Sequence, residues 1–336
     1  MFKKPKIGLA LGGGAARGIS HVGVIEVLEE NGIDIHCVAG TSMGAIVGAV
    51  YLMEGSAAGL KRRMYEFFDS EAFKAAEFEE LRERREEEDP GWFDSMTGLI
   101  RRGIRYSHSV TRQSIISAEV FEALINEIMP DIRIKELPRP FCAVSLDAST
   151  GEEVIWWEGP LREAVWSSSA IPGFFPPLEK NGRLLVDGGW TNAVPVGPAR
   201  MLGAERVIGV DISREVEEMV EYKRGISLML RSAVLTSKHL RELQLKDADL
   251  VLSPDVGCIH WADFAGPEGL VQRGRDAALV SLERIRNLGK RKMPEPGRWI
   301  TEKLSPAKEE PAPVRQTTCP APDEVVAALD TEPRSK

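Results

Sequence analysis

Residues 35–48 read IHCVAGTSMGAIVG, an apolar run followed by Gly-Thr-Ser-Met-Gly and then by small residues. This pattern predicts a strand over Ile35–Ala39 and a helix over Ser42–Met53. Helical spacing over Ile19–Asn31 precedes that strand. Further strand patterns lie at Lys6–Leu11, Phe141–Leu146, Glu153–Trp157, Arg183–Val186 and Arg206–Val210. Strands that alternate with helices predict an α/β fold with three layers, α/β/α, and a mostly parallel central sheet.

The pentapeptide is a G-x-S-x-G motif placed between a strand and a helix. In this context the serine occupies a sharp turn that exposes its hydroxyl above the sheet, and Gly40 and Gly44 leave room for the turn. The start of the helix also favours developing negative charge. The motif therefore predicts that Ser42 is a nucleophile, and a tight turn with an incidental serine is the alternative.

A second glycine-rich turn, GGGAARG, occupies residues 12–18. A dinucleotide-binding G-x-G-x-x-G motif would need glycine in place of Arg17, and a P-loop would need lysine in place of Ile19, so both nucleotide interpretations fail. Consecutive glycines expose backbone N–H groups that can hold an oxyanion, although a turn used only for close packing is the alternative. Arg17 would fix the loop or neutralise a phosphate head group. The predicted oxyanion hole comprises Gly12, Gly13, Gly14, Arg17 and Gly18.

A third motif, Asp-Gly-Gly, follows a predicted strand. Gly188 and Gly189 keep Asp187 free of crowding, so this loop can approach another one. Asp-Gly is also a common turn signal, and the motif is weak by itself. Asp147 and Asp211 end apolar strands as well and are rival acids without paired glycines.

Taken in this order, the three motifs resemble those of the patatin-like phospholipase family. Ser167–Pro177 is similar to the proline-rich segment of that family, and Asn192 and Pro195 match residues that trail its Asp-Gly-Gly. The resemblance covers Lys6–Asp211, with a weaker echo to Asp255. It implies a patatin-like fold and a serine acyl-ester hydrolase that acts on phospholipid or lysophospholipid acyl chains.

The resemblance also implies a Ser-Asp dyad that needs no metal and no organic cofactor. Ser42 would attack the ester carbonyl, Asp187 would accept its proton, and water would later cleave the acyl-enzyme. Such a carboxylate base needs a pKa raised by partial burial. A Ser-acid-His triad would instead nominate His239 or His260, although neither has turn residues beside it. Phe174 and Phe175 would line an acyl-chain groove or belong to the core.

Two other functions stay open on this evidence. An acyltransferase would use the same acyl-enzyme with an alcohol or lysolipid acceptor in place of water. A non-catalytic lipid-binding regulator would keep the scaffold and act by binding, so that Ser42→Ala would leave its cellular effect intact.

The composition limits the classes of binding partner that are expected. The net charge of −8 argues against nucleic acid, because phosphate binding needs a basic face, but it allows transient contact with a membrane surface. Four scattered cysteines argue against a disulfide framework and a structural zinc site. The N-terminus has no signal-peptide pattern, so a cytoplasmic location is expected. The oligomeric state is not predicted.

Residues 5–290 are predicted to form one hydrolase domain. Within it, residues 71–117 contain a charged run followed by Gly-Trp-Phe, which predicts either a surface insertion or a cap over the active site. Residues 291–336 are rich in proline, glutamate and lysine and are predicted to be a disordered tail without catalytic residues.

Overall fold

The computed structural model describes residues 4–76, 78, 114–213, 225–256 and 259–290. Contacts divide the chain into two units, Met1–Arg291 and Lys292–Lys336, and every described residue belongs to the first. The predicted tail at 291–336 and most of the predicted insertion at 71–117 lie outside the described residues.

The described strands form one eight-stranded sheet in the order β5-β6-β3-β2-β1-β7-β8, with β4 paired to β3. The pairs β2–β3, β1–β2, β1–β7 and β7–β8 are parallel, whereas β3–β4, β3–β6 and β5–β6 are antiparallel. The prediction of an α/β fold with a mostly parallel sheet is confirmed. The strands are β1 (Ile7–Leu11), β2 (Ile35–Thr41), β3 (Phe141–Asp147), β4 (Glu153–Trp156), β5 (Leu178–Lys180), β6 (Arg183–Asp187), β7 (Arg206–Val210) and β8 (Leu250–Leu252).

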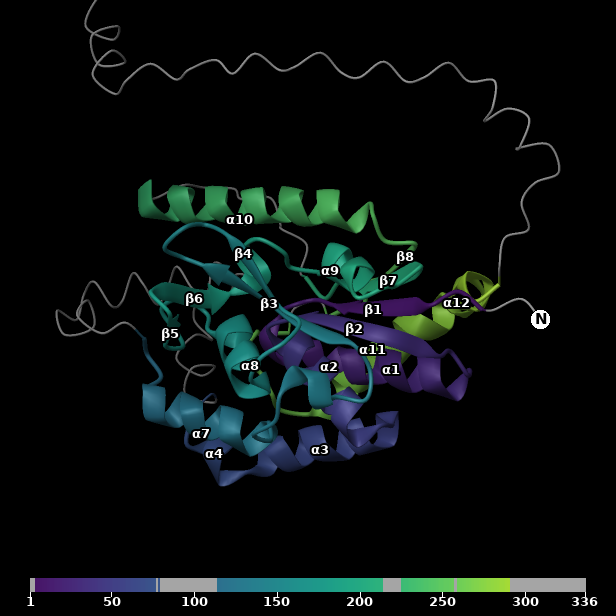
Figure 1. Cartoon of the computed structure of the whole chain (residues 1–336), viewed down its shortest axis with the longest axis horizontal. Coiled ribbons are helices and arrows are strands. Elements are labelled where there is room, and N and C mark those ends of the chain that lie inside the picture. Colours follow the sequence, from purple (N-terminus) through teal and green to yellow (C-terminus); the bar gives the residue numbers. More distant parts are fainter. Residues whose placement is uncertain (1–3, 77, 79–113, 214–224, 257–258, 291–336) are drawn as a thin grey trace, which may run out of the picture. The chain divides into compact units, whose positions relative to one another are not determined.

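Helices cover both faces of this sheet (Figure 1). The α-helices are α1 (Ser20–Glu30), α2 (Met43–Glu54), α3 (Ala57–Asp69), α4 (Glu71–Lys74), α7 (Ala118–Ile128), α8 (Leu161–Ser169), α9 (Val196–Met201), α10 (Gly225–Leu245), α11 (Pro267–Val280) and α12 (Leu282–Leu288). Short 3-10 helices are η1 (Ala15–Ile19), η2 (Ile134–Glu136) and η3 (Gly188–Trp190).

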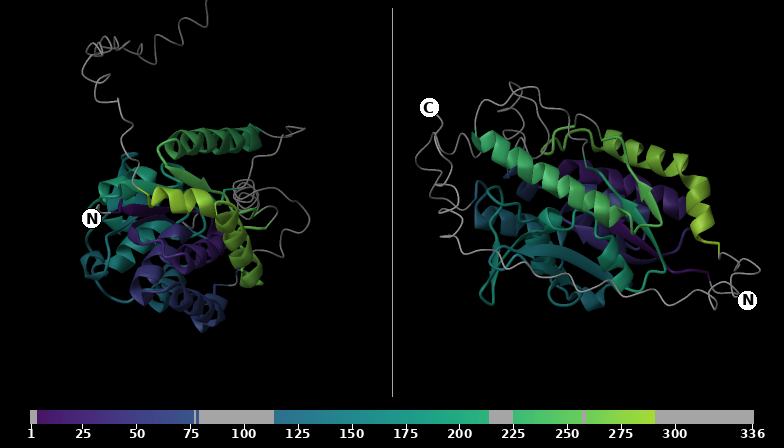
Figure 2. Two further views of the ribbon diagram at one scale, coloured as in Figure 1. Left: turned by 90° about the vertical axis from the view of Figure 1, so that its right-hand side faces the viewer. Right: turned by 90° about the horizontal axis from the view of Figure 1, so that it is seen from above.

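The two faces of the sheet differ in side-chain size. Leu9, Leu11 and Val38 point to the core shared with α1, α2 and α8, whereas Ala10 and Ala39 point to a smaller core under α9. Small side chains let α9 approach β1, β2 and β7 closely. In Figures 1 and 2, α9 and α10 lie on one side of the sheet and α1, α2, α8 and α11 on the other, with α3, α4 and α7 beyond them.

Helices α1 and α11 are in direct backbone contact through two glycines. A Cβ atom on Gly23 would lie 1.8 Å from the Val271 carbonyl oxygen, and one on Gly274 would lie 1.8 Å from the Ser20 carbonyl oxygen. Real Cβ atoms do not approach backbone oxygens so closely, so the spacing of the two helices requires glycine at both positions.

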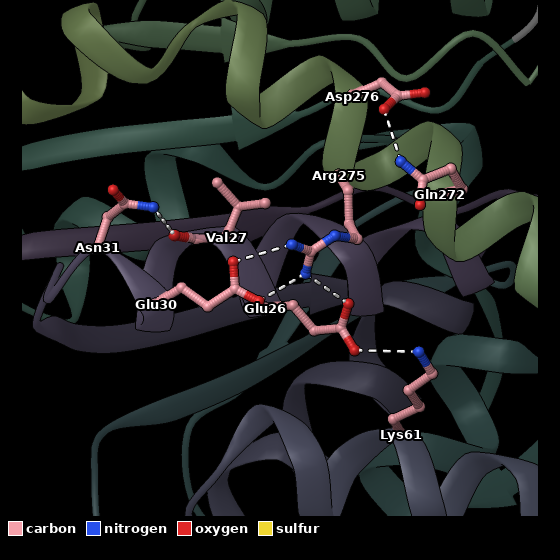
Figure 3. Close-up of polar contacts among 8 residues, drawn as sticks. All are labelled: Glu26, Val27, Glu30, Asn31, Lys61, Gln272, Arg275 and Asp276. Atoms are coloured by element: carbon pink, nitrogen blue, oxygen red, sulfur yellow. Dashed lines mark hydrogen bonds and ion pairs between the residues drawn. The ribbon is translucent and has the colours of Figure 1, made fainter.

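Charged side chains border this contact (Figure 3). The guanidinium of Arg275 donates to both carboxylate oxygens of Glu30, at 2.8 and 2.9 Å, and to Glu26 at 2.9 Å. Lys61 of α3 forms an ion pair with Glu26 at 3.2 Å. Arg275 thereby joins two carboxylates on successive turns of α1, and Lys61 extends the network to a third helix.

The predicted elements that carry the motifs are present, with ends that shift by one or two residues. A short 3-10 helix, η1, occupies the predicted start of the first helix, which begins as α1 at Ser20. The short strands β5 and β8 were not predicted. Among the described helices, none is both long and apolar enough to cross a membrane.

Candidate active site

Ser42 sits on a strained turn between β2 and α2. Its backbone angles are φ 55° and ψ −125°, a region that residues other than glycine rarely adopt. A Cβ on Gly40 would lie 2.5 Å from the Ala45 backbone nitrogen, and one on Gly44 would lie 2.2 Å from the Leu11 carbonyl oxygen. Gly40 therefore allows the turn to close tightly around Ser42, and Gly44 allows the start of α2 to pack against the end of β1.

The sheet register brings Asp187 to the same place. Thr41 at the end of β2 pairs with Val144 of β3, and the next residue of β3, Ser145, pairs with Asp187 at the end of the antiparallel strand β6. The Thr41 hydroxyl also donates to the Asn192 carbonyl oxygen at 2.8 Å, which ties the turn to the segment after Asp187.

The carboxylate of Asp187 is buried, and only one of its two oxygens accepts a hydrogen bond from the described residues. Its Oδ1 accepts the N–H of Gly189 at 2.7 Å, and its Oδ2 has no hydrogen-bond partner among the described residues. Burial raises the pKa of Asp187 to about 6, against smaller lowering effects from the Ser42 hydroxyl and the Gly189 N–H. The Ser42 side chain is thus close enough to act on this carboxylate, although no hydrogen bond of standard geometry joins the two here.

The glycine-rich turn at residues 12–18 lies beside Ser42. A Cβ on Gly13 would lie 3.2 Å from the Cβ of Ser42. The N–H of Gly12 donates to the Val210 carbonyl oxygen at 3.1 Å, and the N–H of Gly13 donates to the Ala193 carbonyl oxygen at 3.0 Å. These two N–H groups hold the turn to β7 and to the segment between η3 and α9, so the prediction that they would bind an oxyanion is corrected.

The next two N–H groups of the turn have no such acceptors. Within the described part of the chain, the N–H of Gly14 and that of Ala15 donate to no protein acceptor. Ala15 has φ 48° and lines the same pocket as Ser42. Of the predicted oxyanion residues, Gly14 therefore has an N–H group without a protein acceptor in the described structure, and the same holds for its neighbour Ala15.

Arg17 and Gly18 are structural in this arrangement. The Arg17 side chain is buried, and its Nε donates to the Ile259 carbonyl oxygen at 2.9 Å. This contact ties the glycine-rich turn to the segment that contains Ile259, and both roles predicted for Arg17 stay predictions. A Cβ on Gly18 would lie 2.3 Å from the Cγ of Met43, so glycine is needed where η1 packs on the start of α2.

The remaining motif glycine, Gly188, packs against β3. A Cβ there would lie 2.4 Å from the Val144 carbonyl oxygen, so the loop after Asp187 can approach the sheet only without a side chain at this position.

The rival acids are engaged elsewhere. Oδ1 of Asp147 accepts the N–H of Ser149 inside a turn. Asp211 accepts the N–H of Ser213 and lies 3.2 Å from the Arg241 guanidinium. Neither of these contacts involves Ser42.

The histidines considered for a triad have other partners. His239 has a side chain that is 76% exposed on α10, and the ring of His260 accepts the N–H of Ala262. His21, which the motifs did not single out, is buried beside the glycine-rich turn, where one ring nitrogen lies 2.8 Å from the Gly12 carbonyl oxygen. Burial lowers the pKa of His21 to about 4, so its ring is neutral near pH 7.

Ser42 opens onto an apolar pocket with about 560 Å³ of empty space, part of it open to solvent. Phe175 lines this pocket and also belongs to the buried core, so both alternatives stay open for this residue. Phe174 packs edge-on against Trp261 at 4.7 Å between ring centroids. The helical aromatic residues of this pocket carried no recognisable sequence signal, because they come from separate elements. The lining residues are Ala15, Ser42, Met43, Ile46, Phe67, Phe73, Phe78, Phe121, Leu124, Ile125, Ile128, Ser169, Ile171, Phe175, Trp261 and Phe264.

Comparison with known proteins gives a consistent picture. The family model described as "Patatin-like phospholipase" matches residues 9–200. Patatin-like phospholipase domain-containing protein 6 from Homo sapiens is 33% identical over 213 residues, which are 63% of this chain and 14% of that protein. An uncharacterised NTE family protein from Mycobacterium tuberculosis is 36% identical over 210 residues, 62% of this chain and 49% of that protein. The chain thus spans half or less of the length of these relatives.

Among solved structures, VipD from Legionella pneumophila aligns with 84% of this chain and 67% of its own, with a TM-score of 0.43 and 14% identity. The family match, in contrast, extends over more than half of the chain and contains the glycine-rich turn, the Ser42 turn and Asp187. On this evidence the chain belongs to the patatin-like phospholipase family.

Proposed function

We propose that this protein is a lipid acyl hydrolase that cleaves carboxylic esters through a Ser42–Asp187 dyad. One observation carries the proposal: a serine on a strained turn lines an almost wholly apolar pocket, and its side chain lies close to a buried carboxylate with a free Oδ2. A pocket of this composition suits an acyl chain, and an ester carbonyl bound beside it would meet the Ser42 hydroxyl.

Each step of the reaction has a candidate group. Ser42 Oγ attacks the ester carbonyl while Oδ2 of Asp187 takes the hydroxyl proton, and the N–H groups of Gly14 and Ala15 hold the oxyanion. Asp187 then returns the proton to the departing alcohol. In the second half, Asp187 removes a proton from water, which attacks the acyl-enzyme carbonyl. Asp187 then returns this proton to Ser42 Oγ as the bond between Oγ and the acyl carbon breaks, and the fatty acid is released.

The pKa of Asp187 supports its role as the base. Burial raises this pKa to about 6, so the group is a stronger base than a solvated aspartate and is still largely ionised near pH 7. A histidine is therefore not required for the proton transfer.

The test is hydrolysis of a nitrophenyl ester together with labelling by a fluorophosphonate, followed by peptide mass analysis. We expect Ser42→Ala and Asp187→Asn to lose turnover by at least about a thousandfold, while His239→Ala keeps it. The label should appear on Ser42. Full activity in Ser42→Ala, or a label on another residue, would refute the proposal and favour a binding function.

The same assay separates hydrolysis from acyl transfer. Adding a lysophospholipid acceptor to wild-type protein should leave free fatty acid as the main product. If the acyl group appeared mainly on the acceptor, the chain would be an acyltransferase that uses the same acyl-enzyme.

The proposal includes transient contact with a membrane from the cytoplasmic side. Lipids with chains that suit this pocket reside in bilayers, and the described cysteines, Cys37 and Cys142, are free thiols as is usual in reducing compartments. Sedimentation with phosphatidylcholine vesicles should carry down a fraction of Ser42→Ala protein. A complete lack of sedimentation, with activity only on monomeric esters, would contradict this part.

A further inference from the structure

Three consecutive serines at the end of α8 lie next to the dyad. The Oγ of Ser168 accepts the N–H of Ser42 at 3.0 Å and donates to the Val144 carbonyl oxygen at 2.6 Å. Two residues later, the Ala170 carbonyl oxygen accepts the N–H of Asp187 at 2.9 Å. Residues 168–170 therefore hold the backbones of both dyad residues, and we call them the dyad bridge.

Ser169 is the central residue of the dyad bridge, and its hydroxyl has no partner. The residue is 6% exposed, and its Oγ makes no hydrogen bond within the described part of the chain. Its neighbours differ in this respect, because Ser167 Oγ lies 2.8 Å from Ser145 Oγ and Ser168 Oγ has the two contacts above. A buried hydroxyl without a partner destabilises the fold, so its presence here requires an explanation.

The surroundings of Ser169 indicate what kind of partner it lacks. It lines the same pocket as Ser42, and apart from these two serines and the indole of Trp261 the lining side chains are apolar. An alkyl chain in this pocket offers no hydrogen-bond acceptor. The group that does is the ester itself, whose carbonyl carbon must lie within reach of Ser42 Oγ.

We infer that the Ser169 hydroxyl donates a hydrogen bond to an oxygen of the scissile ester and so holds the carbonyl at Ser42. This inference rests on the proposed function. Because the dyad bridge anchors Ser42 and Asp187 through its two outer residues, an ester bound to Ser169 is placed relative to both reacting side chains at once.

The Ser169→Ala substitution should affect protein stability and catalysis differently. Ser169→Ala removes a buried hydroxyl that is unpaired in the free protein, so the thermal unfolding midpoint should stay the same or rise. The same change removes a donor from the bound ester, so kcat/KM should fall by about ten- to a hundredfold. Ser168→Ala is the matched control: it breaks two formed hydrogen bonds, so its unfolding midpoint should fall.

The length of the substrate's acyl chain provides a readout that a purely structural role of Ser169 would not give. Nitrophenyl esters from butyrate to dodecanoate are compared in the wild type and in Ser169→Ala. If Ser169 contacts the ester, the loss in kcat/KM is the same for every chain length, because the ester is common to all substrates. A loss that grew or shrank with chain length would place Ser169 against the acyl chain and overturn the inference.

The outcomes also distinguish this inference from the proposed function. If wild-type protein neither hydrolyses esters nor takes a fluorophosphonate on Ser42, the proposed function fails and Ser169 has no ester to hold. If the wild type is active and Ser169→Ala matches it at every chain length, only the inference fails. A Ser169→Ala variant whose unfolding midpoint falls as far as that of Ser168→Ala would also overturn it.

Discussion

Ser42 adopts a backbone conformation that opposes stability. At φ 55° a side chain meets its own backbone, and such residues cost of order 1–3 kcal/mol each. The turn keeps this conformation because Gly40 lets the end of β2 approach the start of α2, and Gly44 lets α2 pack against the end of β1. The gain is a hydroxyl presented directly at the pocket.

We therefore predict that Ser42→Gly is more stable than Ser42→Ala, by about 1 kcal/mol after the greater freedom of glycine in the unfolded chain is allowed for. Chemical denaturation of the two variants measures the difference. Ser232 is an exposed residue of helix α10 and serves as the control. There the order of stability should reverse, so that Ser232→Ala is more stable than Ser232→Gly, because glycine is the poorer helix former. Equal stability of the two Ser42 variants would show that the turn is not strained.

Asp187 links activity to stability through its pKa. An aspartate in the unfolded chain loses its proton near 3.8, whereas in the folded protein burial raises the pKa to about 6. Between these values the folded state binds more protons than the unfolded state, so the stability due to this group is present below 3.8 and is lost as the pH rises through 6.

Asp187→Asn, which cannot ionise, should therefore be more stable than wild type near pH 8, by up to about 3 kcal/mol, with little difference near pH 4. Wild-type kcat/KM should rise with pH through about 6 as the base ionises. Denaturant titrations at several pH values and a pH–rate profile check both effects.

At the scale of elements, the contact of α1 with α11 positions the glycine-rich turn. Helix α1 follows η1 directly, and Gly23 and Gly274 bring its backbone against α11. The Arg275 network borders the same contact on the polar side. A displacement of α11 would therefore be transmitted through α1 to the turn beside Ser42.

Gly274→Ala should destabilise the protein by more than about 2 kcal/mol, because its Cβ would overlap the Ser20 carbonyl and force the helices apart. Gly269→Ala, on the same helix with open space around it, should raise stability by up to about 1 kcal/mol through helix propensity. Thermal unfolding of both variants tests the contact. If Gly274→Ala behaved like Gly269→Ala, the close approach of α1 and α11 would be wrong.

At the scale of the whole molecule, the described core lies within the first unit. Ile285 of α12 is fully buried against this core, and the contacts of the chain separate after Arg291. That residues 5–290 form one hydrolase domain stays a prediction, as does the nature of the remaining residues.

A chain truncated after Arg291 should keep the unfolding midpoint and the esterase activity of the full chain, since the described core and the candidate site lie before that point. A chain truncated after Ser281 loses α12 with its buried Ile285 and should be destabilised by about 2 kcal/mol or more. Lost activity in the first truncation would assign a role to residues 292–336.

Local sequence was enough to predict the tight turn at Ser42, the Asp-Gly-Gly loop and the alternation of strands and helices. Turn chemistry depends on residues that are adjacent in the chain, so glycine at 40 and 44 already indicates a tight turn around Ser42. The direction of a strand in a sheet leaves no such local pattern in the sequence. Only the structure shows that β6 runs antiparallel to β3, which places Asp187 beside Ser42.

The tertiary structure decided which groups of each motif remain available. Gly12 and Gly13 belong to the glycine-rich turn as predicted, but carbonyl oxygens of Val210 and Ala193 occupy their N–H groups. The apolar pocket and the unpaired hydroxyl of Ser169 likewise arise from elements that meet only after folding. The sequence by itself determined the reactive residue types and their order. Their partners, burial and free hydrogen-bonding groups depended on the tertiary structure, because each is set by residues distant in the chain.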